Sequence, residues 1–248
     1  MRCLAAIPVF NESRYLAGIL NTVRGQISDV LVIDDGSTDD TPRVLAATPG
    51  IHVIRHGANQ GYGQSLIDAF GFAAAQRYDW VITLDCDEQH EPGWIPCFIA
   101  EARRDDADVI SGSRYLEHLA GNSRPPADRR RINCVITEIL NSVLGLSLTD
   151  SFCGYKAHRV EAMRRLRLSV PGYAFPLQFW TQAARTGLRI REIPVPLIYN
   201  DPSRHFGETL NDPDVRLRHY LDVLSESLAE AGMPGTVADP QRGGQRCA

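Results

Sequence analysis

The chain has 248 residues, of which 44% are hydrophobic and 23% charged, and its formal net charge is -4. These proportions are those of a globular protein with a sizeable core, and the length predicts one domain with at most a modest appendage. A slightly acidic chain carries no broad basic field, so we expect no nucleic-acid partner and expect any anionic ligand to be held by local groups.

Cysteine usage and apolar runs bear on where the protein works. The six cysteines are scattered without a C-x-x-C pair, a pattern typical of free thiols in a reducing compartment. The first predicted strand begins at Cys3, which leaves no room for a signal peptide, and no run reaches the roughly 20 apolar residues of a spanning helix. We therefore expect a cytoplasmic protein, soluble or attached peripherally to a membrane.

Apolar runs and helical patterns alternate through the first half of the chain. Helices are predicted at 14–23, after the capping residue Ser13, and at 65–76. Alternating strands and helices predict an α/β fold, with a mostly parallel sheet and helices on both faces. The predicted strands of this half cover residues 3–9, 29–34, 51–55, 79–85 and 108–114.

The second half is less regular. A polar, basic segment at 117–131 precedes a series of helical patterns and one apolar strand, and the Gly- and Pro-rich tail at 232–248 is predicted to be disordered. A single domain is therefore expected over residues 1–231. The predicted elements of this half are helices at 132–144, 159–166, 175–186 and 215–229, and a strand at 188–195.

Polar clusters follow four of the predicted strands. They lie at 11–12, 34–38, 59–63 and 85–90. In a parallel sheet the carboxyl ends of the strands share one edge, where ligands of such folds bind. The four clusters are therefore predicted to converge on one crevice.

The cluster at 85–90, D-C-D-E-Q-H, is the sharpest local signal. Alternate residues of an extended segment point the same way, so Asp85, Asp87 and Gln89 can share one face. Two carboxylates and an amide oxygen form a hard site suited to Mg²⁺ or Mn²⁺, completed by water and substrate phosphates. An isolated D-x-D is also common in solvated acidic turns, but its place after a strongly apolar strand favours the metal.

Two further clusters indicate a nucleotide. In the turn at 33–39, Ser37 or Asp39 can cap the next helix, which leaves Asp34 and Asp35 to accept hydrogen bonds from a nucleobase or ribose. The glycines at 59–63 allow close approach of backbone to a ligand. The sequence contains no G-x-G-x-x-G, P-loop or G-x-S-x-G motif, which argues against dinucleotide-binding, P-loop and hydrolase-elbow classes.

Together these motifs resemble a known family. A-I-P-V-F-N-E at 6–12, I-D-D-G-S-T-D-D-T at 33–41, N-Q-G at 59–61 and D-C-D-E-Q-H at 85–90 have the order and spacing of the family 2 inverting glycosyltransferases of the A-type fold. The dolichyl-phosphate mannose synthase branch is the most similar. The resemblance continues through G-S-R at 112–114, D-S-F-C-G-Y-K at 150–156 and E-I-P-V-P at 192–196, and it covers about residues 3–207.

The resemblance implies an A-type nucleotide-diphospho-sugar transferase fold and a metal-dependent enzyme. Such an enzyme moves a sugar, with inversion, from a GDP- or UDP-sugar to an acceptor, here a polyprenyl (dolichyl-type) phosphate at the inner face of the membrane. The nucleotide-binding half is expected at 1–115 and the acceptor half at 116–231.

Roles for single residues follow from the same resemblance. Metal ligands are implied at Asp85, Asp87 and Gln89, with Mg²⁺ or Mn²⁺ as the ion. Pro8, Phe10 and Glu12 would line the nucleotide pocket, Asp35 would contact the base, and Asn59 and Gly61 the ribose side. Arg114 and Arg204 would contact phosphate, and Asp150 would be the carboxylate that faces the acceptor.

The sequence departs from the family pattern on the acceptor side. No basic residue stands near Tyr62, the 150–156 motif commonly reads D-P-T-S-G-F-R, position 178 is Gln178 where glutamate is frequent, and 199–207 lacks the usual Ser-Lys ending. A hydroxyl of a soluble or saccharide acceptor is therefore an alternative, and Asp150 would then remove its proton.

Two other protein classes fit these motifs less well. A non-catalytic nucleotide-sugar binding protein would have no need of an intact Asp85 and Asp87. A nucleotidyltransferase would be expected to open with a Gly-rich, basic loop after the first strand, where this chain has N-E-S at 11–13.

The segment from Arg129 to Arg131 places a basic cluster before an apolar stripe at helical spacing. The stripe either packs on the sheet or enters a lipid interface while the arginines meet anionic head groups. Its residues are Ile132, Val135, Ile136, Ile139, Leu140 and Val143.

Overall fold

The computed structural model describes residues 1–119, 121–199 and 209–233. Residues 234–248 of the predicted tail at 232–248, Arg204 and most of the 199–207 segment lie outside the described residues.

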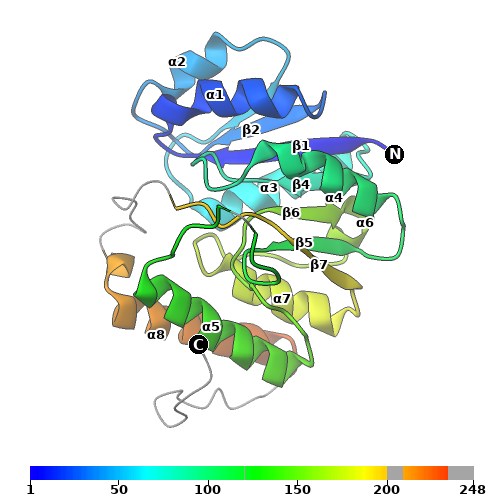
Figure 1. The fold of residues 1–248 in the computed structure, drawn as a ribbon, viewed down its shortest axis with the longest axis vertical. Helices are drawn as coiled ribbons and strands as arrows, with labels where there is room; N and C mark the ends of the chain where they lie inside the picture. Colours follow the sequence, from blue (N-terminus) through cyan, green and yellow to red (C-terminus); the bar gives the residue numbers. More distant parts are fainter. Residues whose placement is uncertain (120, 200–208, 234–248) are drawn as a thin grey trace.

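A seven-stranded sheet forms the centre of the molecule, in the order β3-β2-β1-β4-β6-β5-β7 (Figure 1). All neighbouring strands pair in parallel except β6, which is antiparallel to β4 and β5. The α/β fold with a mostly parallel sheet is thus confirmed. The strands are β1 (Cys3–Val9), β2 (Val30–Asp34), β3 (His52–Arg55), β4 (Trp80–Thr83), β5 (Val109–Ser113), β6 (Lys156–Arg159) and β7 (Ile190–Pro194).

Helices cover both faces of this sheet, as predicted. Along β1, Leu4 and Ala6 belong to one hydrophobic cluster, and Ala5 and Ile7 to a second on the opposite face. A parallel strand buried on both sides reads as a continuous apolar run, which is why it was predictable. The helices are α1 (Ser13–Arg24), α2 (Thr41–Ala46), α3 (Tyr62–Ala75), α4 (Ile95–Ala102), α5 (Ala127–Leu144), α6 (Val160–Met163), α7 (Phe175–Arg185) and α8 (Pro213–Glu230), with short 3-10 turns η1 (Pro92–Trp94) and η2 (Thr209–Asn211).

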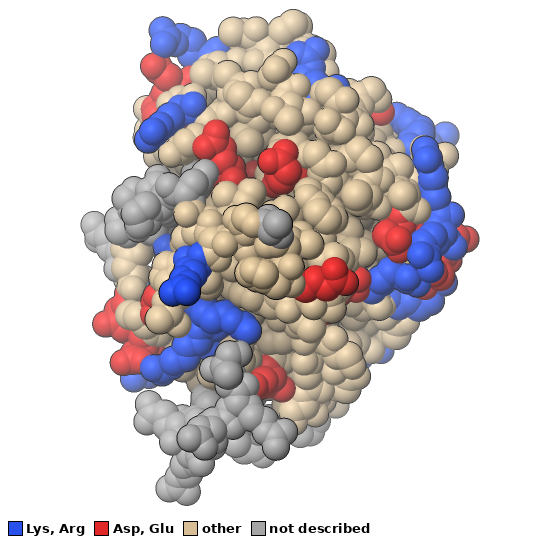
Figure 2. All heavy atoms as spheres, viewed as in Figure 1, with Lys and Arg blue, Asp and Glu red and all other residues tan. Residues whose placement is uncertain are grey.

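Helix α5 begins five residues before the predicted start and packs against α7 and α8, as Figure 1 shows. Its stripe residues Ile132, Ile136 and Leu140 are buried in the core cluster that also holds Leu217 and Leu224 of α8. The alternative in which this stripe enters lipid is therefore wrong. The stripe packs in the cluster that also holds residues of the sheet, and α7 and α8 are its helical neighbours. In Figure 2 basic side chains lie on the surface over α5.

The cysteines and the apolar character of the helices bear on two further expectations. Cys3, Cys86, Cys97 and Cys153 are free thiols, but Cys134 on α5 is disulfide-bonded, so the expectation of six free thiols is wrong for it. Spacing along the chain does not show which distant thiols meet. Within residues 1–119, 121–199 and 209–233, none of the helices has the length and apolar character needed to cross a membrane.

Candidate active site

A cleft of about 890 Å³ lies at the carboxyl ends of β1, β2 and β4 and extends to α5 and α8. The structure brings ten of the residues singled out in the sequence into its wall. They are Pro8, Phe10, Glu12, Asp35, Asn59, Gly61, Asp85, Asp87, Gln89 and Arg114.

Asn11 fixes the two loops at the N-terminal side of the cleft. Its backbone is left-handed (φ 58°), and its Oδ1 accepts hydrogen bonds from the backbone N–H of Thr38 (2.8 Å) and Asp39 (3.3 Å). The backbone N–H of Asn11 donates to Ser37 Oγ (2.9 Å). These bonds join the β1–α1 and β2–α2 loops and hold neighbouring Phe10 at the cleft wall.

Asp35 organises the next loop of the cleft. Its Oδ1 accepts a hydrogen bond from the N–H of Gln60 (2.7 Å) and its Oδ2 one from the N–H of Gly61 (2.8 Å). Asp34, the other carboxylate left open by the sequence, is fully buried, accepts from the N–H of Ser37 (2.9 Å) and pairs with Arg55 (3.2 Å). Of the two, only Asp35 lines the cleft.

Gly61 and Gly63 allow the segment after Asn59 to lie close to the backbone of the 170–172 loop. Gly61 has φ 103°, and a Cβ on it would lie 2.4 Å from the carbonyl oxygen of Pro171. A Cβ on Gly63 would lie 2.2 Å from the carbonyl oxygen of Val170. The buried Gln178 supports this second loop from below, because its Oε1 accepts from the N–H of Val170 (3.0 Å). The departure at position 178 therefore lies behind the cleft wall.

Asp85 and Asp87 follow β4 in a tight turn, in which Glu88 has φ 59°. The N–H of Gln89 donates to Asp87 Oδ1 (3.0 Å), and the N–H of Asp85 donates to His90 Nδ1 (2.9 Å). Burial lowers the pKa of His90 to about 4, so its ring is neutral at pH 7 and Nδ1 can accept that bond. His90 thus orients the turn that carries the two carboxylates.

The carboxylate of Asp85 lies in a close cradle. A Cβ on Gly154 would come within 2.8 Å of Asp85 Oδ2, and Tyr62 is hydrogen-bonded to Asp85. Among the described residues no third His, Cys, Asp or Glu joins Asp85 and Asp87 in a metal-binding group. A hard ion that takes further ligands from an amide oxygen, water and phosphate fits this set, as Mg²⁺ and Mn²⁺ do.

Arg114 also lines the cleft and is held by Asp150. Arg114 Nε donates to Asp150 Oδ2 (2.7 Å) and Nη2 to Oδ1 (2.9 Å), and Asn133 Nδ2 also donates to Oδ1 (2.7 Å). Burial raises the pKa of Asp150, but the charge and hydrogen bonds of Arg114 outweigh it and hold the pKa well below its usual range. Asp150 is fully buried behind Arg114, which departs from the expectation that it faces the acceptor.

Helices α5 and α8 supply further residues of the cleft lining. Arg129 lines the cleft and donates from Nη1 to Tyr199 Oη (2.6 Å). Arg216, only 3% exposed, pairs with Asp128 (2.7 Å) and donates to the carbonyl of Leu210 (2.8 Å). Arg216, His219 and Tyr220 of α8 were not predicted, because a helical pattern does not show which face of the helix meets the cleft.

The sequence and the fold are similar to those of known proteins. The sequence profile of the family described as "Glycosyl transferase family 2" matches residues 5–167. An undecaprenyl-phosphate mannosyltransferase of Micrococcus luteus is 32% identical, over 84% of this chain and 87% of the relative. A polyprenol monophosphomannose synthase of Mycolicibacterium smegmatis is 29% identical, over 78% of this chain and 76% of the relative.

A solved structure shows the same fold. Glucosyl-3-phosphoglycerate synthase from Mycobacterium tuberculosis, in complex with UDP, superposes with a TM-score of 0.71 at 18% identity and covers 95% of this chain and 82% of its own. A second structure of that enzyme, with Mn²⁺, UDP and phosphoglyceric acid, has a TM-score of 0.69. The resemblance seen in the motifs is confirmed, and the chain belongs to glycosyl transferase family 2 as a glycosyltransferase.

Proposed function

We propose that this enzyme transfers a sugar, with inversion, from a nucleoside diphosphate sugar to a polyprenyl phosphate. The observation that carries the proposal is the mixed lining of the cleft. It combines the oxygen ligands Asp85, Asp87 and Gln89 with the guanidinium groups of Arg114 and Arg129. The oxygen ligands suit a divalent cation with a diphosphate, and the arginines suit an anionic acceptor.

The donor side follows from the loops of β1 to β4. The base would lie by Asp35, whose Oδ2 accepts a hydrogen bond from the N–H of Gly61 and, as a carboxylate oxygen, has capacity for one more donor. Pro8, Phe10 and Glu12 would line this pocket, and Asn59 and Gly61 its ribose side. Asp85, Asp87 and Gln89 would hold Mg²⁺ or Mn²⁺, which when bound neutralises charge on the departing diphosphate. GDP- and UDP-sugars both remain candidates as donor.

The acceptor side favours a group that is already an anion. A phosphate oxygen would attack the anomeric carbon on the face opposite the diphosphate, forming a new C–O bond. The old C–O bond breaks at the same time, and its electron pair leaves with the nucleoside diphosphate. Such a nucleophile has no proton to lose, and the buried, ionised Asp150 is placed to fix Arg114 and not to accept one. Arg204 stays a candidate for a second phosphate contact.

The named relatives support the same acceptor class, since two of them carry undecaprenyl-phosphate or polyprenol in their names. A polyprenyl chain resides in a bilayer, so the enzyme would work as a peripheral protein at the inner membrane face. The aromatic side chain of Tyr173 lines the cleft and is exposed, so it offers apolar surface to the polyprenyl chain.

A transfer assay tests this assignment. The purified protein is incubated with Mn²⁺ and a panel of GDP- and UDP-sugars, once with a polyprenyl phosphate in detergent and once with soluble saccharides that offer only hydroxyls. We expect a glycosyl-phospholipid product and no saccharide product. Transfer to hydroxyls alone would overturn the acceptor assignment, and donor binding without transfer or hydrolysis would indicate a nucleotide-sugar binding protein.

A further inference from the structure

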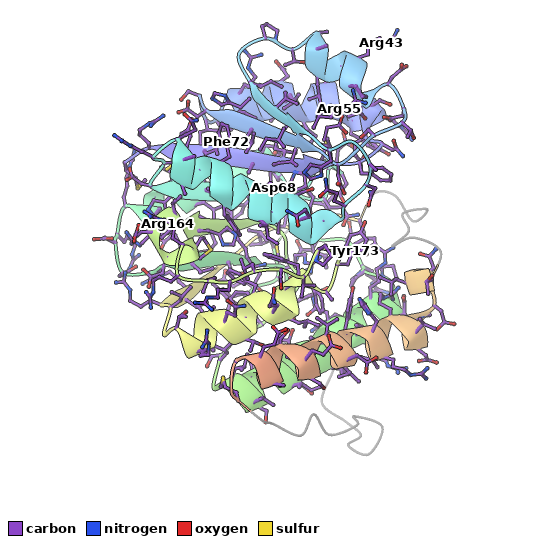
Figure 3. All side chains as sticks on the ribbon, turned by 180° about the vertical axis from the view of Figure 1, so that it is seen from behind. Arg43, Arg55, Asp68, Phe72, Arg164 and Tyr173 are labelled. Carbon is purple, nitrogen blue, oxygen red and sulfur yellow. The ribbon has the colours of Figure 1, made fainter. Side chains whose placement is uncertain are left out.

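His56 is a buried histidine that lies directly between two carboxylates. It follows β3, and its Nδ1 is 2.6 Å from Asp35 Oδ1 while its Nε2 is 2.8 Å from Asp68 Oδ2. Asp68 belongs to α3 and is labelled on that helix in Figure 3. His56 therefore bridges the nucleotide side of the cleft to the helix behind it.

Both contacts are hydrogen bonds only if each ring nitrogen of His56 carries a proton. An ionised carboxylate only accepts hydrogen bonds, and a neutral imidazole has one N–H donor and one acceptor nitrogen. A neutral His56 would set a lone pair against a carboxylate oxygen at one of its two contacts. The imidazolium form donates at both, and these charge-assisted bonds are the stronger kind.

The charged surroundings of His56 favour that form. Burial lowers the pKa of His56, but its hydrogen bonds to Asp35 and Asp68 and their charges outweigh burial and raise the pKa above its ordinary value. Arg55, the preceding residue on β3, is directed to Asp34 (3.2 Å). From α3, the neutral Gln64 donates to the other oxygen of Asp68 (3.1 Å).

The charge of His56 affects the cleft because His56 contacts Asp35, which holds a loop of the cleft. This carboxylate is 4% exposed, and it holds the N–H groups of Gln60 and Gly61 in the loop that lines the cleft. A buried carboxylate without a compensating cation is costly, so Asp35 and its loop would shift if His56 lost its charge.

We propose that doubly protonated His56 is a positioning residue that fixes Asp35 and the 59–61 loop, so that nucleotide affinity falls as rising pH removes its second proton. The part that concerns affinity rests on the proposed nucleotide donor. The protonation and loop-fixing part concerns the free protein and can be measured without any ligand.

The first experiment uses the free protein labelled with ¹⁵N-histidine. NMR should show hydrogen on both ring nitrogens of His56 at pH 7, assigned by the loss of its signals in His56→Gln. Amide exchange at Gln60 and Gly61 should quicken once His56 becomes neutral, beyond the base-catalysed trend of other loop amides. A neutral His56 at pH 7, or loop exchange that ignores its titration, would overturn the proposal.

The second experiment measures the Kd of a nucleoside diphosphate with Mg²⁺ from pH 6.5 to 9. Wild type should bind about tenfold more weakly at the alkaline end, equivalent to ~1.4 kcal/mol. His52→Gln, a change of an exposed histidine on the same strand, should keep that dependence and corrects for titration of the ligand. His56→Gln should bind weakly throughout and lack the step.

Asp68→Asn provides a second variant in case His56→Gln does not fold. With one carboxylate fewer, His56 should lose its second proton at lower pH, and the affinity step should move with it. A step that stays in place, or equal profiles for wild type and His56→Gln, would overturn the proposal. If no variant binds nucleotide at any pH, the proposed function fails, while the NMR measurements still decide the role of His56.

Discussion

Aspartates near the strand ends of this protein differ in what their surroundings allow. Asp34 is fully buried and occupied by Ser37 and Arg55, whereas Asp35, the next residue, lines the cleft. The side chain of Asp85 is 33% exposed and also lines it. Access to the cleft therefore separates Asp35 and Asp85, which can meet a ligand, from Asp34, which only holds the chain, although Asp35 also holds the N–H groups of Gln60 and Gly61.

The metal assignment predicts a specific loss in Asp87→Asn. Removing one anionic ligand should weaken Mn²⁺-supported binding of a nucleoside diphosphate about tenfold or more, because the remaining site attracts the ion less. Calorimetry with Mn²⁺ and with chelator measures this. Glu88→Gln removes the same charge from the exposed neighbour in the turn and should bind as wild type does. Equal affinities with and without metal in all three proteins would contradict the assignment.

Asp150→Asn separates positioning from base catalysis. If Asp150 fixes Arg114, the variant should be less stable by about 3–5 kcal/mol, and KM for polyprenyl phosphate should rise because Arg114 loses its bidentate partner. A general base would instead lose about 10²–10⁴-fold in kcat. Steady-state kinetics, with a nucleotide Kd as the control expected to stay constant, decides between the two.

The pH dependence of stability follows from the same pair. The folded-state pKa of Asp150 lies below its unfolded value of about 3.9, so its contribution is present above that pH and is lost as pH falls below it. Asp150 therefore adds no limb to a rate profile between pH 6 and 8.

At the scale of single residues, the sequence indicates chemistry but not burial. Asp85, Asp87 and Gln89 were predicted as a set from the alternation of an extended segment. All three line the cleft, but they lie in a tight turn in which Glu88 has φ 59° and not in an extended segment. No pattern indicated that His56 would meet Asp35 and Asp68, because these residues come from β3, the β2 loop and α3. The ion pair that buries Asp150 joins residues 36 positions apart and is equally invisible in the sequence.

At the scale of elements, α3 contains two glycines in opposite surroundings. A Cβ on Gly63 would lie 2.2 Å from a backbone oxygen of the 170–172 loop, whereas one on Gly71 would have no atom within 4 Å. Gly63→Ala should destabilise the protein by about 1–3 kcal/mol through overpacking and should weaken nucleotide binding. Gly71→Ala should stabilise it by about 0.4–1 kcal/mol by reducing the freedom of the unfolded chain.

Thermal unfolding and nucleotide titration of both variants provide the measurement. Equal melting temperatures for Gly63→Ala and Gly71→Ala would show that the loop at 170–172 does not pack on α3 as described.

Helix α5 offers a second matched pair. Ile136 is fully buried, so Ile136→Ala should cost about 2–5 kcal/mol of unfolding free energy, or several degrees in Tm. Glu138 lies on the exposed face, and Glu138→Ala should stay within about 0.5 kcal/mol of wild type. An Ile136→Ala variant that keeps its stability but loses vesicle binding would revive the lipid-facing interpretation.

Helices and strands were predicted well where their buried residues are all apolar, and less well where polar residues are buried. Strands β1, β2 and β4 are continuous apolar runs, and their positions were predicted to within a few residues. Strand β6 was missed because its sequence, K-A-H-R, is polar, although three of its four residues are buried. The apolar stripe of α5 was recognised. Its periodicity does not show which elements pack against it, and these are α7 and α8.

At the scale of the whole molecule, two parts of the chain line the cleft, and we assign them different tasks. Loops after β1, β2 and β4 supply the carboxylates Glu12, Asp35, Asp85 and Asp87, whereas Arg114 follows β5, and Arg129 and Arg216 come from α5 and α8. The motifs that identify the family lie mainly in the first part, where the fold constrains spacing. The second part was predicted least well.

This division predicts that donor and acceptor binding can be altered separately, and α5 provides the test. Arg129 lines the cleft, whereas Arg131, two residues along, has a side chain 63% exposed and reaches Asp214 at 3.9 Å. Arg129→Gln should raise KM for polyprenyl phosphate about tenfold, since a charge-assisted bond to phosphate is worth about 1.5–3 kcal/mol. The nucleoside diphosphate Kd should not change, because we assign the metal and base contacts to Asp85, Asp87, Gln89 and Asp35 and not to Arg129. Arg131→Gln should alter neither constant. If Arg129→Gln instead weakens nucleotide binding and leaves the acceptor KM alone, the assignment of Arg129 to the acceptor is wrong, and this arginine serves the donor.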